Sequence, residues 1–130
     1  MAGNLDDAEE LKAYRYAARC ERVRKEWGLF PKQWAVLMAL YAAKGATVPV
    51  LDLCAAVPYQ ATRVTTGGIN RQIRSLATLI SWIRSRSLMQ IEAIDRRRGR
   101  WSPHEKFAFG YRLTDESVRR LAEALGDDGR

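Results

Sequence analysis

Arginine and asparagine gather in one stretch of this sequence in a pattern that suits contact with nucleic acid. Asn70, Arg71 and Arg74 lie within five residues of one another and follow the pair Gly67 and Gly68. A guanidinium can grip guanine O6 and N7, and an asparagine amide can grip adenine N6 and N7. Glycines at a helix start let backbone N–H groups approach a phosphate. The residue types therefore predict a surface that reads base edges and holds phosphates.

A second cluster follows about twenty residues later, where Arg96, Arg97, Arg98 and Arg100 fall within five positions. Four cations at this spacing repel one another unless a polyanion or solvent relieves the repulsion. Arginine presented from a loop suits a narrow minor groove or the phosphates beside it. This cluster predicts a second contact with the same partner.

The overall charge is concentrated in the same region. Residues 59–114 carry 11 Lys or Arg and 3 Asp or Glu, a net +8, whereas residues 1–58 are +1 and residues 115–130 are −2. A localised, arginine-rich excess indicates a polyanion partner. We expect Arg63, Arg84 and Arg86 to add phosphate contacts. The alternative is a solvated basic face that binds nothing.

Helices must position the first cluster. The spacing of apolar residues predicts helices over residues 5–27, from Pro31 to about Gly45, over residues 50–57, and from Thr65 or Thr66 toward Ser87. The last of these has a single apolar seam, made of Ile69, Ile73, Leu76, Ile80 and Ile83. Its opposite face carries Gly67, Asn70, Arg71, Arg74 and Thr78.

A hairpin must position the second cluster. Residues 88–94 and 107–113 read as strands, the loop between them holds the arginines, and residues 46–48 can add a short strand. A last helix begins at Thr114 or Asp115 and ends at Gly126. The predicted fold is α+β, mainly α: a winged helix-turn-helix over residues 29–114, an added N-terminal helix over 1–28, and a C-terminal helix with its tail over 115–130.

Two resemblances support this expectation. GLFPKQWAVLMALYAAKG and YRLTDESVRRLAEAL resemble the opening helix and the strand-to-helix exit of MarR-type regulators, over about residues 28–125. The sequence departs from the family pattern at three points. Phe30 replaces the usual threonine cap, and the hairpin has only Asp95-Arg96-Arg97-Arg98 of the family's wing signature. The long C-terminal helix of the family is also missing. INRQIRSLATL with FGYRL is similar to the DNA-binding domain of OmpR/PhoB-type regulators, without a receiver domain. Both resemblances imply duplex DNA binding.

We therefore expect a DNA-binding transcriptional regulator whose recognition helix, about residues 65–80, enters the major groove, with residues 95–106 as the wing. The expected DNA-binding residues are Arg63, Thr65, Thr66, Gly67, Asn70, Arg71, Arg74, Thr78, Arg96, Arg97, Arg98 and Arg100. Two alternatives stay open: a winged helix that binds another protein, and an architectural binder of DNA or RNA without sequence preference. Similar affinity for every duplex would favour the architectural role.

The terminal helices predict a homodimer, because each carries an apolar strip beyond the needs of a three-helix core. The residues expected at the dimer interface are Leu11, Tyr14, Val23, Trp27, Val118, Leu121 and Leu125. The alternative is that both helices pack on their own core and leave a monomer.

The residues give little support to other classes of protein, such as enzymes, metal-binding proteins or membrane proteins. His104 is the only histidine, and Cys20 and Cys54 lie far apart without metal-ligand spacing, so we expect no enzyme, cofactor or metal site. The two cysteines indicate a reducing cytoplasm. The longest apolar run, residues 34–43, is too short for a membrane span, and the acidic N-terminus is no secretory signal. The residues name no small-molecule effector.

Overall fold

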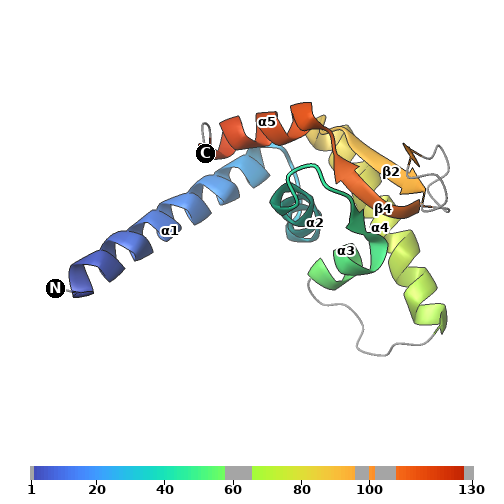
Figure 1. The fold of residues 1–130 in the computed structure, drawn as a ribbon, viewed down its shortest axis with the longest axis horizontal. Helices are drawn as coiled ribbons and strands as arrows, with labels where there is room; N and C mark the ends of the chain where they lie inside the picture. Colours follow the sequence, from blue (N-terminus) through green and yellow to red (C-terminus); the bar gives the residue numbers. More distant parts are fainter. Residues whose placement is uncertain (1, 58–65, 96–99, 102–107, 128–130) are drawn as a thin grey trace.

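The computed structural model describes the backbone of residues 2–57, 66–95, 100–101 and 108–127, and the side chains of residues 7–57, 74–94 and 109–127 (Figure 1). Five helices and four strands lie in these ranges. They are α1 (Ala2–Glu26), α2 (Pro31–Ala42), β1 (Val48–Pro49), α3 (Val50–Ala56), α4 (Thr66–Ser87), β2 (Ile91–Asp95), β3 (Arg100–Trp101), β4 (Ala108–Leu113) and α5 (Asp115–Leu125). The fold class is α+β and mainly α, as the sequence predicts.

The helix ends follow from residues visible in the sequence. Thr114 caps α5, since its side-chain oxygen accepts a hydrogen bond from the Ser117 backbone N–H at 3.3 Å. Gly126 ends α5 in the left-handed conformation, with φ at 75°. At the start of α2 the Phe30 N–H donates to Gln33 Oε1 at 2.8 Å, so a glutamine satisfies the helix entrance in place of a threonine cap.

The core lies between α2, α3, α4 and the sheet. Leu76, Ile80 and Ile83 of the predicted α4 seam are fully buried, while the side chains of Ile69 and Ile73 lie outside the described residues. The inward residues expected in α3 are buried as well. They are Val50, Leu53, Cys54 and Val57. The prediction for α3 is confirmed, and that for α4 is confirmed over Leu76, Ile80 and Ile83, because a single apolar seam leaves only one face to bury.

Within the described residues the strands form one antiparallel sheet in the order β1-β4-β2-β3. The short strand expected at residues 46–48 is observed at Val48–Pro49, where Val48 pairs with Tyr111. Strand β3 lies where the sequence indicated only a loop, and Trp101 pairs with Ile94. The sheet therefore gives the β2–β4 hairpin an extra short strand near its tip.

Helix α1 divides into two halves. Its C-terminal half packs against α5, and its N-terminal half extends away from the rest of the molecule toward the N-terminus (Figure 1). The inward stripe consists of Tyr16, Cys20, Val23 and Trp27, spaced by four, three and four residues. Apolar spacing in the sequence predicts a stripe of Leu11, Tyr14, Ala18 and Trp27 with Cys20 and Val23 beside it. Leu11, Tyr14 and Ala18 are exposed, whereas Trp27, Cys20 and Val23 belong to the inward stripe.

This arrangement corrects the predicted dimer residues. Val23, Leu121 and Leu125 are buried in the core of their own chain, so the prediction that they form a dimer surface is wrong. Trp27 and Val118 are partly buried against the same core. The reason is that α5 and α1 pack against each other and on the core, which removes their apolar strips from solvent. Leu11 and Tyr14 alone of the seven remain exposed.

The turn between α1 and α2 is held by two arginines. Gly28 adopts a positive φ of 68°, which lets the chain reverse direction after α1. Arg24 Nη1 donates to the Leu29 carbonyl at 2.8 Å, and Arg86 Nη1 of α4 donates to the Gly28 carbonyl at 3.2 Å. The direction of α1 is thereby tied to the C-terminal end of α4.

Candidate nucleic-acid interface

Helix α4 presents one face to the core and the opposite face to solvent. Over its described side chains the outward face holds Arg74, Thr78, Ser81, Trp82 and Ser85, all of them exposed. Thr78 Oγ1 donates to the Arg74 carbonyl at 3.2 Å, one turn back along the helix. The prediction that Arg74 and Thr78 share an exposed face opposite the seam is confirmed.

The other predicted residues of this helix lie in its first two turns. Thr66, Gly67, Asn70 and Arg71 are helical in backbone, so the expected recognition segment is a helix from Thr66 onward. Their side chains lie outside the described residues, as do Arg63 and Thr65 altogether. In Figure 1 the first turns of α4 project beyond α3 and away from the sheet.

The hairpin lies at the same end of the long axis as the first turns of α4, and the N-terminal half of α1 lies at the opposite end (Figure 1). Arg100 begins β3, opposite Asp95 in the pairing with β2. Arg96, Arg97 and Arg98 fall outside the described residues. The described strands thus place Asp95 and Arg100, the residues on either side of 96–99, opposite each other in the sheet.

Three arginines of the basic middle stretch are engaged within the chain itself. Arg84 donates two hydrogen bonds to the Ile91 carbonyl, from Nε at 3.0 Å and from Nη2 at 2.7 Å. Arg112 forms an ion pair with Glu92 at 2.7 Å. Arg86, besides its bond to Gly28, lies over the Trp82 ring at 4.5 Å. The prediction that Arg84 contacts phosphate is not supported by this geometry, because its guanidinium holds the start of β2.

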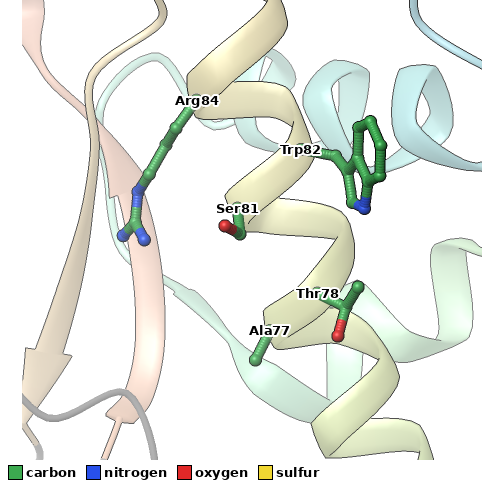
Figure 2. A pocket seen from close by; sticks show the side chains of 5 residues that line it. All are labelled: Ala77, Thr78, Ser81, Trp82 and Arg84. Carbon is green, nitrogen blue, oxygen red and sulfur yellow. The ribbon is translucent and has the colours of Figure 1, made fainter.

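An open pocket of about 380 Å³ lies on the outward face of α4. Its lining residues are Ala77, Thr78, Ser81, Trp82 and Arg84. Figure 2 shows small side chains along the middle of the helix, with Arg84 pointing toward the strands on one side and Trp82 toward the opposite side. The hollow therefore forms because two long side chains flank Ala77 and Ser81.

Trp82 belongs to the exposed face and was missed as a site residue. It is 43% exposed, and it follows Ile80 by two residues, roughly 200° around a helix. That offset from the seam is visible in the sequence and indicates an outward position. A partly exposed tryptophan beside an arginine suits contact with a sugar or a planar group.

The two cysteines lack the surroundings of reactive thiols. Both are free, Cys54 is buried and Cys20 is partly buried. Burial raises the pKa of each thiol above its usual value, which favours the protonated form. In the part of the chain that the structure describes, no three His, Cys, Asp or Glu side chains gather as metal ligands would. None of the described helices combines the length and apolarity needed to cross a bilayer.

Comparison with protein-family models, with curated proteins and with solved structures finds no match to this chain. The interpretation of the site therefore rests on its residues and on the arrangement of the elements that carry them.

Proposed function

We propose that this chain is a winged-helix protein that binds double-stranded DNA and regulates transcription. The observation that carries the proposal is the arrangement of α2, β1, α3, α4, β2 and β4, with β1 beside β4 and β4 beside β2. This order of elements is that of a winged helix-turn-helix, in which the helix before the hairpin is the recognition helix. Here that helix is α4, with an exposed arginine on its outward face.

In this proposal the first half of α4 lies in the major groove. The groove is about 12 Å wide and admits one helix. Asn70 and Arg71 precede the exposed Arg74 by four and three residues in the same helix, the spacing at which helical residues share a face. Arg71 and Arg74 contact guanine edges or phosphates, and Asn70 contacts adenine. Gly67 allows the helix start to approach a phosphate.

The hairpin acts as the wing. Arg96, Arg97, Arg98 and Arg100 contact the minor groove or its phosphates, while the β2–β4 pairing sets the direction of the tip. Arg112 and Glu92 neutralise each other on the strands. The wing therefore strengthens binding to every sequence, and α4 supplies the sequence preference.

The contacts within the chain limit the number of cations that can neutralise DNA phosphates. Eleven cations lie in residues 59–114, and four of them have described side chains. Three of these four, Arg84, Arg86 and Arg112, bond to groups of the chain itself, so at most eight cations are available for phosphates. If about six of the remaining cations neutralise phosphates, the slope of log K against log salt is about −5. Both free cysteines suit a reducing compartment, so we place the protein in the cytoplasm.

The decisive experiment selects bound DNA from a pool of random duplexes and then measures affinity for the selected site against salt. We expect one enriched sequence and a steep salt dependence. Arg74→Gln should lower affinity for the selected site at least tenfold and relax the preference at one position. The matched control is Arg120→Gln on α5, which removes the same charge from an exposed residue away from α4.

Two outcomes would contradict the proposal. Equal affinity for all duplexes would replace the regulator with an architectural nucleic-acid binder. A flat salt dependence, or no binding at low salt, would remove DNA altogether and leave the basic face to an acidic protein partner.

A further inference from the structure

The N-terminal half of α1 has little packing within the described chain, where Glu9, Lys12 and Ala13 only line an open hollow beside Gly126 and Asp127. Every side chain from residue 7 to residue 15 is exposed, and this half extends from the molecule as a free rod (Figure 1). This half continues a 25-residue helix whose C-terminal half is packed, so its nucleation is provided for, but most helical stability in proteins comes from packing of an apolar face. The length of this unsupported segment points to a partner that covers it.

The exposed half carries an apolar stripe of its own. Ala8, Leu11, Tyr14 and Ala18 follow one another at intervals of three, three and four residues, which places them along one face. Leu11 is 49% exposed and Tyr14 is 73% exposed. This face lies roughly opposite the stripe of Tyr16, Cys20, Val23 and Trp27 that packs on the core, since Leu11 and Val23 differ by about 120° and Leu11 and Cys20 by about 180°.

The charges along α1 identify the partner as a second copy running in the opposite direction. Residues 6–10 hold four acidic side chains and no basic ones, whereas residues 11–25 hold six basic side chains and one acidic one. A parallel pair would bring like charges together, which destabilises the contact. An antiparallel pair sets the acidic end of each helix beside the basic part of the other, so the helix complements itself.

We propose that this chain forms a homodimer through antiparallel pairing of the two α1 helices about Tyr14 and Arg15. In this register Leu11 faces the partner's Ala18, Tyr14 faces the partner's Arg15, and Asp7 faces the partner's Arg22. The contact is isologous, since each pair occurs twice across the two-fold axis. Two helices of this size give an interface at the small end of the stable range, so the dimer is expected at micromolar concentrations and weakens with salt.

The geometry of such a dimer separates its two DNA-binding ends, a consequence that rests on the proposed function. From the pairing centre to Glu26 is about 12 residues, or roughly 17 Å along the helix. The two Glu26 residues, where α1 ends, therefore lie about 35 Å apart along the paired helices, and the hairpin ends point away from the centre (Figure 1). On one face of a DNA duplex, successive major grooves lie about 34 Å apart. The dimer thus fits widely spaced sites or two separate duplexes.

The first experiment measures the mass of the full-length protein by light scattering from about 5 to 500 µM, without DNA. We expect a monomer–dimer equilibrium. The Leu11→Asp/Tyr14→Asp double variant should weaken association at least tenfold and keep the helical circular dichroism of the body. Leu51→Asp is the matched control, because Leu51 is an exposed leucine at 59% on α3, outside α1. A wild-type monomer throughout this range overturns the proposal.

A charge exchange tests the antiparallel register. Asp7→Arg alone and Arg22→Asp alone each place like charges together and should weaken association about three- to tenfold. The double variant Asp7→Arg/Arg22→Asp restores opposite charges and should recover most of the wild-type association. A double variant weaker than both single variants would overturn the register.

The last experiment mixes two duplexes with different fluorescent labels and measures energy transfer on adding protein. Wild type should bring the two duplexes together, while Leu11→Asp/Tyr14→Asp should bind each duplex without joining them. If the protein is a monomer that still binds duplex DNA, the proposed dimer is wrong and the proposed function stands. If the protein is a dimer that binds no duplex, the proposed function is wrong and the dimer stands, so the two failures are distinguishable.

Discussion

The guanidinium of Arg84 and the carbonyl of Ile91 join the end of α4 to the start of β2. Two donors of one side chain, at 3.0 and 2.7 Å, converge on a single carbonyl oxygen seven residues later in the chain. Hydrogen bonds from charged donors are about twice as strong as neutral ones. The contact therefore sets where the hairpin leaves α4, and it gives a structural role to a residue that the charge pattern assigned to DNA.

A matched pair of substitutions on α4 should separate these two roles. Arg84→Gln and Arg74→Gln remove the same charge from the same helix. Arg84→Gln should lower the free energy of unfolding by about 1–3 kcal/mol and leave the salt slope of DNA binding nearly unchanged. Arg74→Gln should leave stability within about 0.5 kcal/mol and lower affinity for the selected site at least tenfold. Urea unfolding and salt-dependent affinity measure both, and the reverse pattern would exchange the two roles.

Asp127 ties the end of α5 to two other helices. Its Oδ2 accepts a hydrogen bond from the Tyr41 hydroxyl at 2.7 Å and from the Tyr16 hydroxyl at 3.4 Å. Tyr41→Phe keeps the ring and removes the shorter bond, so the free energy of unfolding should fall by about 1.5–2 kcal/mol. Urea denaturation checks this value. Tyr14→Phe is the control, because Tyr14 is exposed; an equal loss in both variants would show that the bond to Asp127 contributes nothing.

The stability of the protein should depend on the ionisation of Tyr16 at high pH. Burial raises the pKa of Tyr16 from 10.0 to about 12, with smaller contributions from Cys20 and Asp127. Between these two values the unfolded chain has released a proton that the folded chain retains, so the free energy of unfolding falls as pH rises. The contribution of Tyr16 is fully present below pH 10.0 and is lost as pH rises through about 12.

The measurement compares urea unfolding of wild type and Tyr16→Phe across this pH window. The wild-type stability should fall more steeply, because the variant lacks the shifted group. Tyr14→Phe, which changes an exposed tyrosine, should follow the wild-type curve. If the free energy of unfolding falls equally steeply with pH in wild type and Tyr16→Phe, groups other than Tyr16 cause the loss of stability at high pH.

Gly110 lies where two strands leave no room for a side chain. A Cβ at this position would be 2.5 Å from the Val48 carbonyl oxygen and 2.8 Å from Thr47 Cγ2. The backbone oxygen cannot rotate away, so Gly110→Ala must separate β1 from β4. We expect a loss of about 2–3 kcal/mol in the free energy of unfolding, measured by thermal and urea denaturation. Glu123→Ala, on the exposed side of α5, should change stability by less than about 0.5 kcal/mol.

Local patterns along the chain predicted most of the elements correctly. The buried part of the α4 seam, the cap at Thr114, the end of α5 at Gly126 and the extra strand at Val48 are all visible in short windows. The reason is that each depends on neighbours within one helix or strand: a seam repeats every turn, and a cap needs one hydroxyl in the right place. The exposed position of Arg74 follows from the same seam.

Two features were decided by the tertiary structure: which face of α1 is buried and what the Arg84 guanidinium contacts. Helix α1 has apolar residues on two opposite faces, and periodicity gives no means of choosing between Tyr14 and Val23 as the inward residue. The choice depends on how α5 and α2 fold back on α1, more than eighty residues away in the case of α5. Likewise, an arginine such as Arg84 has the same charge whether it faces solvent or a carbonyl. Only the direction of the short turn between α4 and β2 brings the Ile91 carbonyl within reach of its guanidinium.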